Sequence, residues 1–133
     1  MKKHVTNLEL SKKLKELGVK QESEFYWVKN IQGITELYFN GNPTSAPIYV
    51  IYPDAISAFL SSELGEMLPY LVEGKDKNFF YETGKCEKNN RYCREHEVGY
   101  SREGYDVLYS ITDNTEANAR AKMLIYLIEN NLI

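Results

Sequence analysis

Apolar residues recur at helical spacing over the last segment of the chain. They lie three or four residues apart and form one stripe: Ala117, Ala121, Leu124, Ile125, Ile128 and Leu132. Asp113 and Glu116 have the spacing of a capping pair, which satisfies free backbone N–H groups at a helix start. The pattern predicts an amphipathic helix from Asp113 to Ile133, with an ion pair between Glu116 and Arg120 on its surface.

A second helical pattern occupies the beginning of the chain. Thr6 and Glu9 match a capping box, with Val5 placed to pack on Leu10, and this predicts a start at Thr6. Gly18 is the expected stop, so the helix should cover about 7–17. Its buried stripe would be Leu10, Leu14 and Leu17.

The turn after this helix invites comparison with a helix-turn-helix DNA-binding unit. Such a unit would require a recognition helix from Lys20 to Asn30 with an apolar residue near position 24. Glu24 is charged, and the run 25–28 (FYWV) is richer in strand formers than in helix formers. The sequence therefore favours a strand from Phe25 over a recognition helix.

The middle of the chain alternates short apolar runs with turn residues. A turn at 30–33 predicts a hairpin that joins a strand from Phe25 to a second strand over 34–39. A short helix should begin at Ser61, with Leu64, Met67 and Leu68 facing inward. Further strands are expected at 48–52, 70–72, 78–86 and 105–112, and 98–104 is expected to be a loop or a sheet edge. Asn89 and Asn90 are suited to a two-residue turn, which would pair Lys88 with Arg91, Glu87 with Tyr92 and Cys86 with Cys93.

This order of elements lacks the regular alternation of a parallel sheet. It predicts an α+β fold: a mainly antiparallel sheet packed by an N-terminal and a long C-terminal helix, with one short middle helix. The length of 133 residues is that of one domain, and we expect residues 1–133 to form it.

Charge and composition exclude some classes of function. The net charge is −3, but residues 1–20 hold six Lys and two Glu, a local balance of +4. A basic end of this kind is either a solvated helix face or an electrostatic footprint for phosphate. No apolar run approaches the roughly 20 residues of a membrane span, and no apolar signal core follows the basic start. We expect a cytoplasmic protein with no membrane contact, in which both cysteines are reduced thiols.

Candidate catalytic and metal-binding residues do not combine into a site. Cys86, Cys93 and His96 lie within one predicted hairpin and suggest zinc, but a fourth ligand would have to be a carboxylate such as Glu95 or Glu97. Cys93 with His96 would form a nucleophile and base on a solvated hairpin, where nothing excludes water. Glu63 and Glu66 could share a proton or a metal, yet such pairs are usually solvated. We therefore predict a non-enzymatic protein without metal or cofactor.

Aromatic and basic residues offer two kinds of binding surface. An outward patch of Tyr and Trp rimmed by charge would suit a protein partner. Aromatic residues interleaved with Lys and Arg between 79 and 94 could instead stack the bases of a single-stranded nucleic acid, although interleaved Glu residues cancel the local field. The candidate interaction surface consists of Tyr26, Trp27, Tyr81, Tyr92, Lys12, Lys13, Arg91 and Arg94.

Three stretches together resemble a family of small uncharacterised proteins encoded by tailed bacteriophages and prophages. They are LELSKKLKELGVKQES at 8–23 with Trp27, SELGEMLP at 62–69, and EANARAKMLIYLIENNLI at 116–133. The resemblance implies phage or prophage origin and action in the bacterial cytoplasm, and it transfers no catalytic or binding residue.

Two hypotheses for function follow. The first is a phage accessory protein that binds a phage or host protein. The alternative is a nucleic-acid-binding protein that uses the basic N-terminal helix with Arg91 and Arg94, whose affinity would fall steeply with salt. Self-association is compatible with both.

Overall fold

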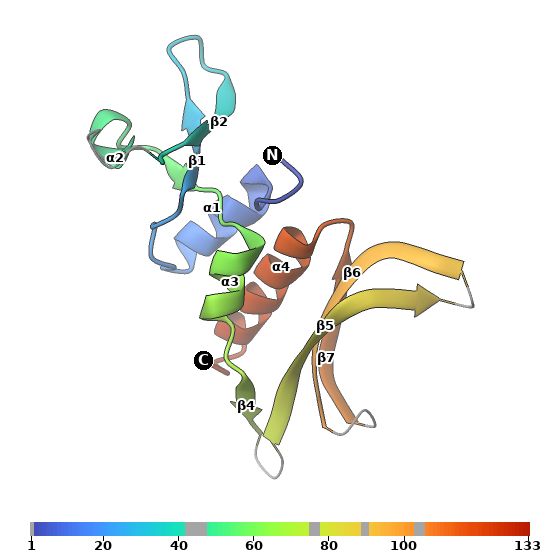
Figure 1. Cartoon of the computed structure of the whole chain (residues 1–133). Helices are drawn as coiled ribbons and strands as arrows, with labels where there is room; N and C mark the ends of the chain where they lie inside the picture. Colours follow the sequence, from blue (N-terminus) through green and yellow to red (C-terminus); the bar gives the residue numbers. More distant parts are fainter. Residues whose placement is uncertain (1, 42–47, 75–77, 89–90, 103–105) are drawn as a thin grey trace.

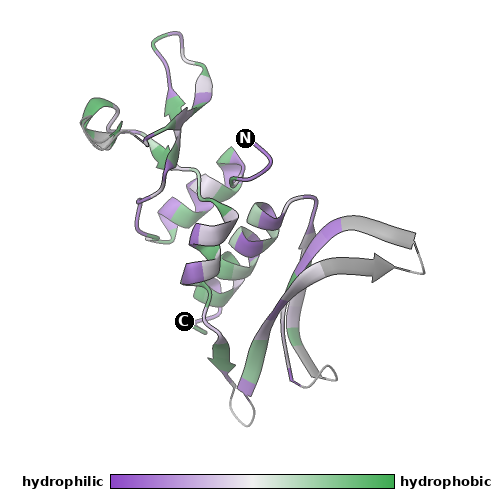
Figure 2. Ribbon diagram, in the orientation of Figure 1, coloured by the Kyte–Doolittle hydropathy of each residue, from purple (hydrophilic) through white to green (hydrophobic). Residues whose placement is uncertain are grey.

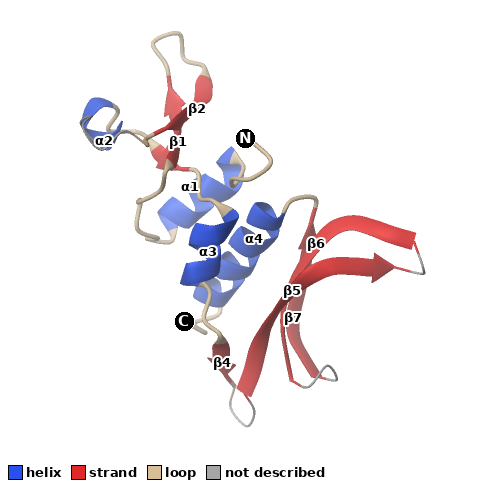
Figure 3. Cartoon of the chain, viewed as in Figure 1, coloured by secondary structure: helices blue, strands red, loops and turns tan. Residues whose placement is uncertain are grey.

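The chain folds into two antiparallel sheets and a layer of helices (Figures 1 and 3). A computed structural model describes residues 2–41, 48–74, 78–88, 91–102 and 106–133, without the side chains at 49, 85–88, 91–94, 106 and 107. Its elements are α1 (Leu8–Glu16), β1 (Phe25–Lys29), β2 (Thr35–Phe39), α2 (Ile48–Ile51), β3 (Ile56–Ser57), α3 (Ser61–Met67), β4 (Leu71–Glu73), β5 (Asn78–Lys88), β6 (Arg91–Arg102), β7 (Asp106–Asp113) and α4 (Glu116–Glu129). One sheet has the strand order β2-β1-β3 and the other β4-β5-β6-β7. The predicted α+β class is confirmed.

Helix α4 lies at the centre of the molecule. One side of it packs on β6 and β7, and the other packs on α1 and α3, as Figure 1 shows. The N-terminal helix lies on the side of α4 opposite the four-stranded sheet, and it also packs beside β3. The two terminal helices lie on the same side of that sheet, in successive layers.

The burial of α4 is broader than the single stripe predicted from the sequence. Ala119, Met123 and Leu127 are fully buried although they lie outside that stripe, while Ile125 and Ile128 are only partly buried. The alanines allow two partner layers to approach the helix closely, because a small side chain keeps helix axes near their neighbours. The predicted ion pair between Glu116 and Arg120 is present.

Both long helices begin at a residue other than the predicted cap. In α4 the cap is Thr115, whose hydroxyl accepts from Asn118 N–H at 3.2 Å, and not Asp113. In α1 the cap is Asn7, whose Oδ1 accepts from Leu10 N–H at 2.9 Å, and not Thr6. Thr6 is buried, and its hydroxyl accepts from Phe59 N–H instead. In both helices the cap is a polar residue one or two positions after the predicted cap. Sequence spacing alone does not decide which of two neighbouring polar residues caps a helix.

The end of α1 follows the prediction. Gly18 has a positive φ of 82°, a conformation that glycine adopts without steric cost. Gly18 N–H bonds Lys15 O and Val19 N–H bonds Leu14 O, both at 3.0 Å, which is the Schellman arrangement. The chain then continues to β1, so no recognition helix forms.

The β1–β2 hairpin is confirmed, with Phe25 opposite Phe39 and Lys29 opposite Thr35. The strand expected at 48–52 is wrong, because Ile48–Ile51 forms the single helical turn α2, closed by Tyr52 N–H to Ile48 O at 2.7 Å. The strand that pairs with the second edge of β1 is β3, through Tyr26 to Ser57 and Trp27 to Ile56.

The loop or edge expected at 98–104 is also wrong for its described part, because β6 extends to Arg102 between β5 and β7. Val98 and Tyr100 are fully buried under α4, whereas Gly99 and Ser101 alternate with them on the other face. Small residues on that outer face hide the period-two pattern of a half-buried strand.

Tyr100 anchors the main core. Its hydroxyl donates to Pro69 O at 2.6 Å, and its ring meets Tyr81 edge-on at 5.6 Å between centroids. Burial raises the pKa of Tyr100 well above its usual range, so the phenol stays neutral. The residue thereby joins the central strand to the end of α3.

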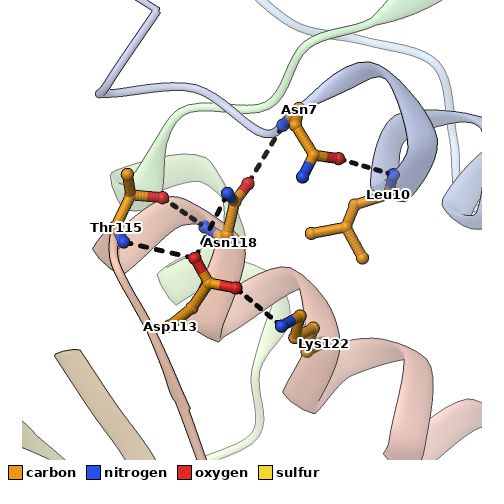
Figure 4. A network of polar contacts seen from close by, with 6 residues as sticks. All are labelled: Asn7, Leu10, Asp113, Thr115, Asn118 and Lys122. Carbon is orange, nitrogen blue, oxygen red and sulfur yellow. Dashed lines mark hydrogen bonds and ion pairs between the residues drawn. The ribbon is translucent and has the colours of Figure 1, made fainter. Parts of the chain in front are cut away.

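A polar network joins the start of α1 to the start of α4 (Figure 4). Asn118 Oδ1 accepts from Asn7 N–H at 3.0 Å, and Asn118 Nδ2 donates to Asp113 Oδ1 at 3.3 Å. Asp113 also accepts from Thr115 N–H and pairs with Lys122 Nζ at 2.6 Å. Burial would raise the pKa of Asp113, but these hydrogen bonds and the Lys122 charge together hold it below its usual value.

None of the helices in the described ranges is both long enough and apolar enough to cross a bilayer.

Candidate interaction surfaces

One part of the molecule stands apart from the helical layer and exposes large apolar side chains. We call residues 25–41 and 48–57 the hairpin lobe; it comprises β1, β2, α2 and β3 (Figure 1). Ile31 is fully exposed, and four more apolar residues are 53% to 63% exposed: Ile34, Phe39, Val50 and Ile51. Figure 2 shows the apolar colour of α2 and of parts of the hairpin.

The turn of the hairpin holds Ile31 outward. Asn30 Oδ1 accepts from Gln32 N–H at 2.9 Å and from Ile34 N–H at 3.0 Å, which fixes the turn from its side chain. Gly33 supplies the positive φ of 80° that the turn needs. Ile31 is therefore exposed on a turn that the Asn30 side chain holds by hydrogen bonds to the backbone.

The lobe has a small core of its own. Tyr26, Val28, Ile48 and Ala55 are buried together, with Tyr38 and Tyr52 packed around them. Ile48 points into this cluster, whereas Val50 and Ile51 on the same turn point away from it. The exposed apolar side chains are therefore surplus to the packing of the lobe.

Strand β2 forms one edge of the lobe sheet. Within the described ranges it pairs only with β1, so its outer side presents free backbone N–H and C=O groups. Such an edge can accept an additional strand from another chain. Phe39 lies on this strand, so apolar surface and free backbone groups adjoin.

Three aromatic members of the predicted interaction surface, Tyr26, Trp27 and Tyr81, are buried or half-buried. Tyr26 is buried, and its hydroxyl accepts from Ser23 N–H and donates to Gln21 O. Trp27 is half-buried, and its Nε1–H donates to Thr6 O at 3.0 Å. Tyr81 is half-buried against Tyr100. These three side chains contribute packing and hydrogen bonds within the fold, and their part in an interaction surface stays a prediction.

Of the basic residues in the predicted interaction surface, the two lysines have described side chains and the two arginines do not. Lys12 is exposed, and Lys13 pairs with Glu129 at 2.8 Å across α1 and α4. That partner raises the pKa of Lys13, through a hydrogen bond and its charge. The side chains of Arg91, Tyr92 and Arg94 lie outside the described part of the chain, so their roles stay predictions.

The residues of the predicted zinc site and thiol site lie largely in the segment 85–94, whose side chains the structure does not describe. Lys88 pairs with Arg91 and Glu87 with Tyr92, as the predicted register requires, and an irregularity follows between Lys85 and Glu87. The side chains of Cys86 and Cys93 and the turn residues 89 and 90 lie outside the description. Among the described residues, no group of three or more His, Cys, Asp or Glu could hold a metal ion.

Glu63 accepts three hydrogen bonds within the fold, and these replace the proton or metal that its spacing from Glu66 could have let the two residues share. Its Oε2 accepts from Ser23 Oγ at 2.8 Å and from Leu60 N–H at 2.7 Å, and its Oε1 accepts from Glu24 N–H at 3.0 Å. The carboxylate thus fixes the start of α3 to the chain before β1.

The two histidines of the chain meet at one pocket beside the first turn of α4. His4 and His96 line it with Lys3, Asn114 and Thr115. Glu116 lines the same pocket and is paired with Arg120. The N-terminal residues are therefore brought to the sheet end that precedes α4, which sequence separation alone gives no means to foresee.

The exposed apolar residues of the hairpin lobe are not among the residues predicted from the sequence as an interaction surface. In the sequence, Ile31 stands between Asn30 and Gln32 in a polar turn, where an apolar residue has no packing partner. This position is the feature of the sequence that indicates an exposed apolar side chain. Comparison of the chain with protein-family models, with curated proteins and with solved structures finds no match.

Proposed function

We propose that this chain is a non-enzymatic phage or prophage accessory protein that binds a phage or host protein through the hairpin lobe. The observation that supports the proposal is the group of five large apolar side chains on one projecting lobe. Several large apolar side chains exposed on one small lobe are more than the scattered single residues of an ordinary surface.

The energetic argument is one of surplus exposure. Burial of apolar surface contributes about 25 cal/mol per Å² removed from water. Ile31 gains nothing of this kind from the fold, and Val50 and Ile51 gain only part of it, because more than half of each side chain stays exposed. A partner that covers them would gain it on binding, less the cost of association.

The free edge of β2 supports the same location. A partner strand added there would pair with backbone groups over 35–39 while its side chains meet Phe39. This mode combines hydrogen bonds, which fix the register, with apolar contacts, which provide affinity.

The phage origin rests on the sequence resemblance alone. The three stretches that carry it fold into α1, α3 and α4, which pack on one another. They form the scaffold, and the hairpin lobe lies almost entirely outside them. The resemblance therefore supports an origin and a scaffold, while the binding role is supported by the lobe.

The test is an affinity purification of tagged protein from infected or lysogenic bacteria, with and without nuclease. Wild type is compared with Ile31→Ser/Val50→Ser, and Ile133→Ser, another exposed apolar residue far from the lobe, is the matched control. We expect a protein partner that survives nuclease, is kept by Ile133→Ser and is lost with the double variant.

Two outcomes would contradict the proposal. Equal retention by the double variant would place the binding surface elsewhere. Loss of all retained material with nuclease, and a steep decrease with added salt, would favour the nucleic-acid alternative through the exposed Lys12 and the arginines of β6.

A further inference from the structure

The face of the four-stranded sheet turned away from α4 carries a shallow hollow of about 210 Å³. In Figure 1 no described element covers this face of β5, β6 and β7. The residues that line it are Glu82, Thr83, Gly84, Glu97, Gly99, Tyr100, Ser101 and Ser110, which we call the outer hollow.

The strand register explains why a hollow forms here. Glu82 is opposite Gly99 and Gly84 is opposite Glu97, so each carboxylate faces a glycine across the β5–β6 pair. The two glycines supply no side chains and leave a floor of bare backbone. The two glutamates occupy diagonal positions, whose separation of about 7–8 Å long side chains can span.

The charges of the outer hollow are of one sign. The ion pairs among the described residues include neither Glu82 nor Glu97, and Glu97 accepts a hydrogen bond from Ser110 Oγ–H. Two carboxylates beside one another repel, and a cation between them would remove that cost.

A second observation indicates a ligand. Ser101 is only 4% exposed and lines the hollow, yet its Oγ has no hydrogen-bond partner among the described residues. It follows Glu97 and Gly99 at alternate positions on β6, so its side chain belongs to the same face. An unsatisfied buried hydroxyl costs free energy, which a donor from a ligand would recover.

The geometry points to an organic cation with N–H donors as the ligand, and we propose that the outer hollow binds a guanidinium or primary ammonium group. Such a group can donate to both glutamates and to Ser101 Oγ while its flat or narrow body lies on the glycine floor. Phe80, partly exposed and next to Glu82 on the same face, can pack on the alkyl part.

A divalent metal ion is less suited to this site. Ca²⁺ and Mg²⁺ need six or more oxygen ligands at about 2.0–2.6 Å, whereas the two carboxylates are diagonal and a cluster of three metal-ligating side chains is missing from the described residues. The proposal is independent of the hairpin lobe, which lies on the other side of the helical layer.

The test is a titration of ¹⁵N-labelled full chain followed by amide chemical shifts. N-acetyl-arginine amide represents a protein side chain and spermidine a free polyamine, each against NaCl of equal ionic strength. We expect saturable shifts at Gly84, Gly99 and Ser101 with at least one of the two. The tighter ligand identifies the source of the cation.

Three variants sharpen the result. Glu82→Gln should weaken binding at least tenfold, and Glu66→Gln, an exposed glutamate on α3, should leave it unchanged. Gly84→Val should abolish binding without a charge change, because a Cβ at Gly84 meets no atom within 4 Å and only fills the hollow. Shifts equal to those in NaCl, or Mg²⁺ or Ca²⁺ binding more tightly at the same amides than either organic cation, would overturn the proposal.

Discussion

Single residues in this protein hold distant segments together through buried polar contacts. Thr6 is the clearest case, because its hydroxyl bonds Ser11 Oγ at 2.7 Å and accepts from Phe59 N–H at 3.0 Å. All of these groups are buried, so each depends on the others for its hydrogen bond. From the sequence Thr6 had the appearance of a helix cap, since hydroxyl chemistry is the same at both kinds of site.

Thr6→Val is expected to destabilise the fold by about 1–3 kcal/mol, because it leaves Phe59 N–H and the Ser11 hydroxyl buried without a partner. Urea unfolding measures the change. Thr35→Val, at an exposed position on β2, is the control and should change stability by less than about 0.5 kcal/mol. An equal effect of the two substitutions would refute the assignment of Thr6 as a buried connector.

Asp113 should make stability depend on pH. Because its folded pKa lies below the ordinary value of about 4, its ionised form is stabilised by folding. That contribution is complete above the unfolded pKa and is lost as the pH falls through the folded pKa.

Asp113→Asn should therefore cost about 1–3 kcal/mol at pH 7, since it removes a charged partner of Lys122. The difference from wild type should shrink as the pH falls below about 4. Thermal unfolding between pH 2 and pH 7 measures it, and a difference that stays constant over this range would contradict the account.

At the scale of elements, the types of most helices and strands followed from periodicity and turn residues. The hairpin from Phe25, the helix stop at Gly18 and the strands near 70–72 and 78–86 were all predictable. Val98 to Arg102 was not, because Gly99 and Ser101 make the outer face of a central strand as inconspicuous as a loop. The single helical turn α2 was not either, because a short run of Ile, Tyr and Val has the composition of a strand.

Helix α4 offers a test of its two-sided burial. Leu127→Ala should cost about 2–5 kcal/mol, because Leu127 is fully buried, and Ile128→Ala should cost clearly less, because Ile128 is only partly buried. The single stripe in the sequence predicts the opposite order. Equilibrium unfolding of the two variants decides between a helix packed on one side and a helix packed on two.

Two glycines, one at the end of α1 and one inside β5, differ in what a side chain would meet. Gly18→Ala should cost about 1–2 kcal/mol, because a side chain at positive φ is strained. Gly84→Ala should be neutral or stabilising by up to about 1 kcal/mol, because its φ is not positive and a Cβ there meets nothing. Thermal unfolding of both variants measures the contrast, and a similar loss in the two would contradict it.

At the scale of the whole molecule, the arrangement separates a scaffold from surfaces that the scaffold does not need. The helices and the inner face of the four-stranded sheet contain the main core, and the hairpin lobe has a smaller one. The fold class was predictable, since it depends on element types. The candidate surfaces were not, since the exposure of Ile31 or the hollow beside Glu82 depends on which residues face one another across strands.

Because the side chains of Ile31 and Val50 are exposed, the free energy of unfolding of Ile31→Ser/Val50→Ser in urea should lie within about 0.5 kcal/mol of the wild-type value. A larger loss would mean that these side chains serve folding, and the loss of a partner could then not be assigned to the surface itself.

Hydrogen exchange of the protein, free and in complex with its captured partner, tests the hairpin lobe as the binding surface most directly. The account predicts slower exchange in the complex at the amides of 31–39 and 48–52, with no change on α1. Protection confined to α1, or to the outer face of β5 and β6, would contradict it.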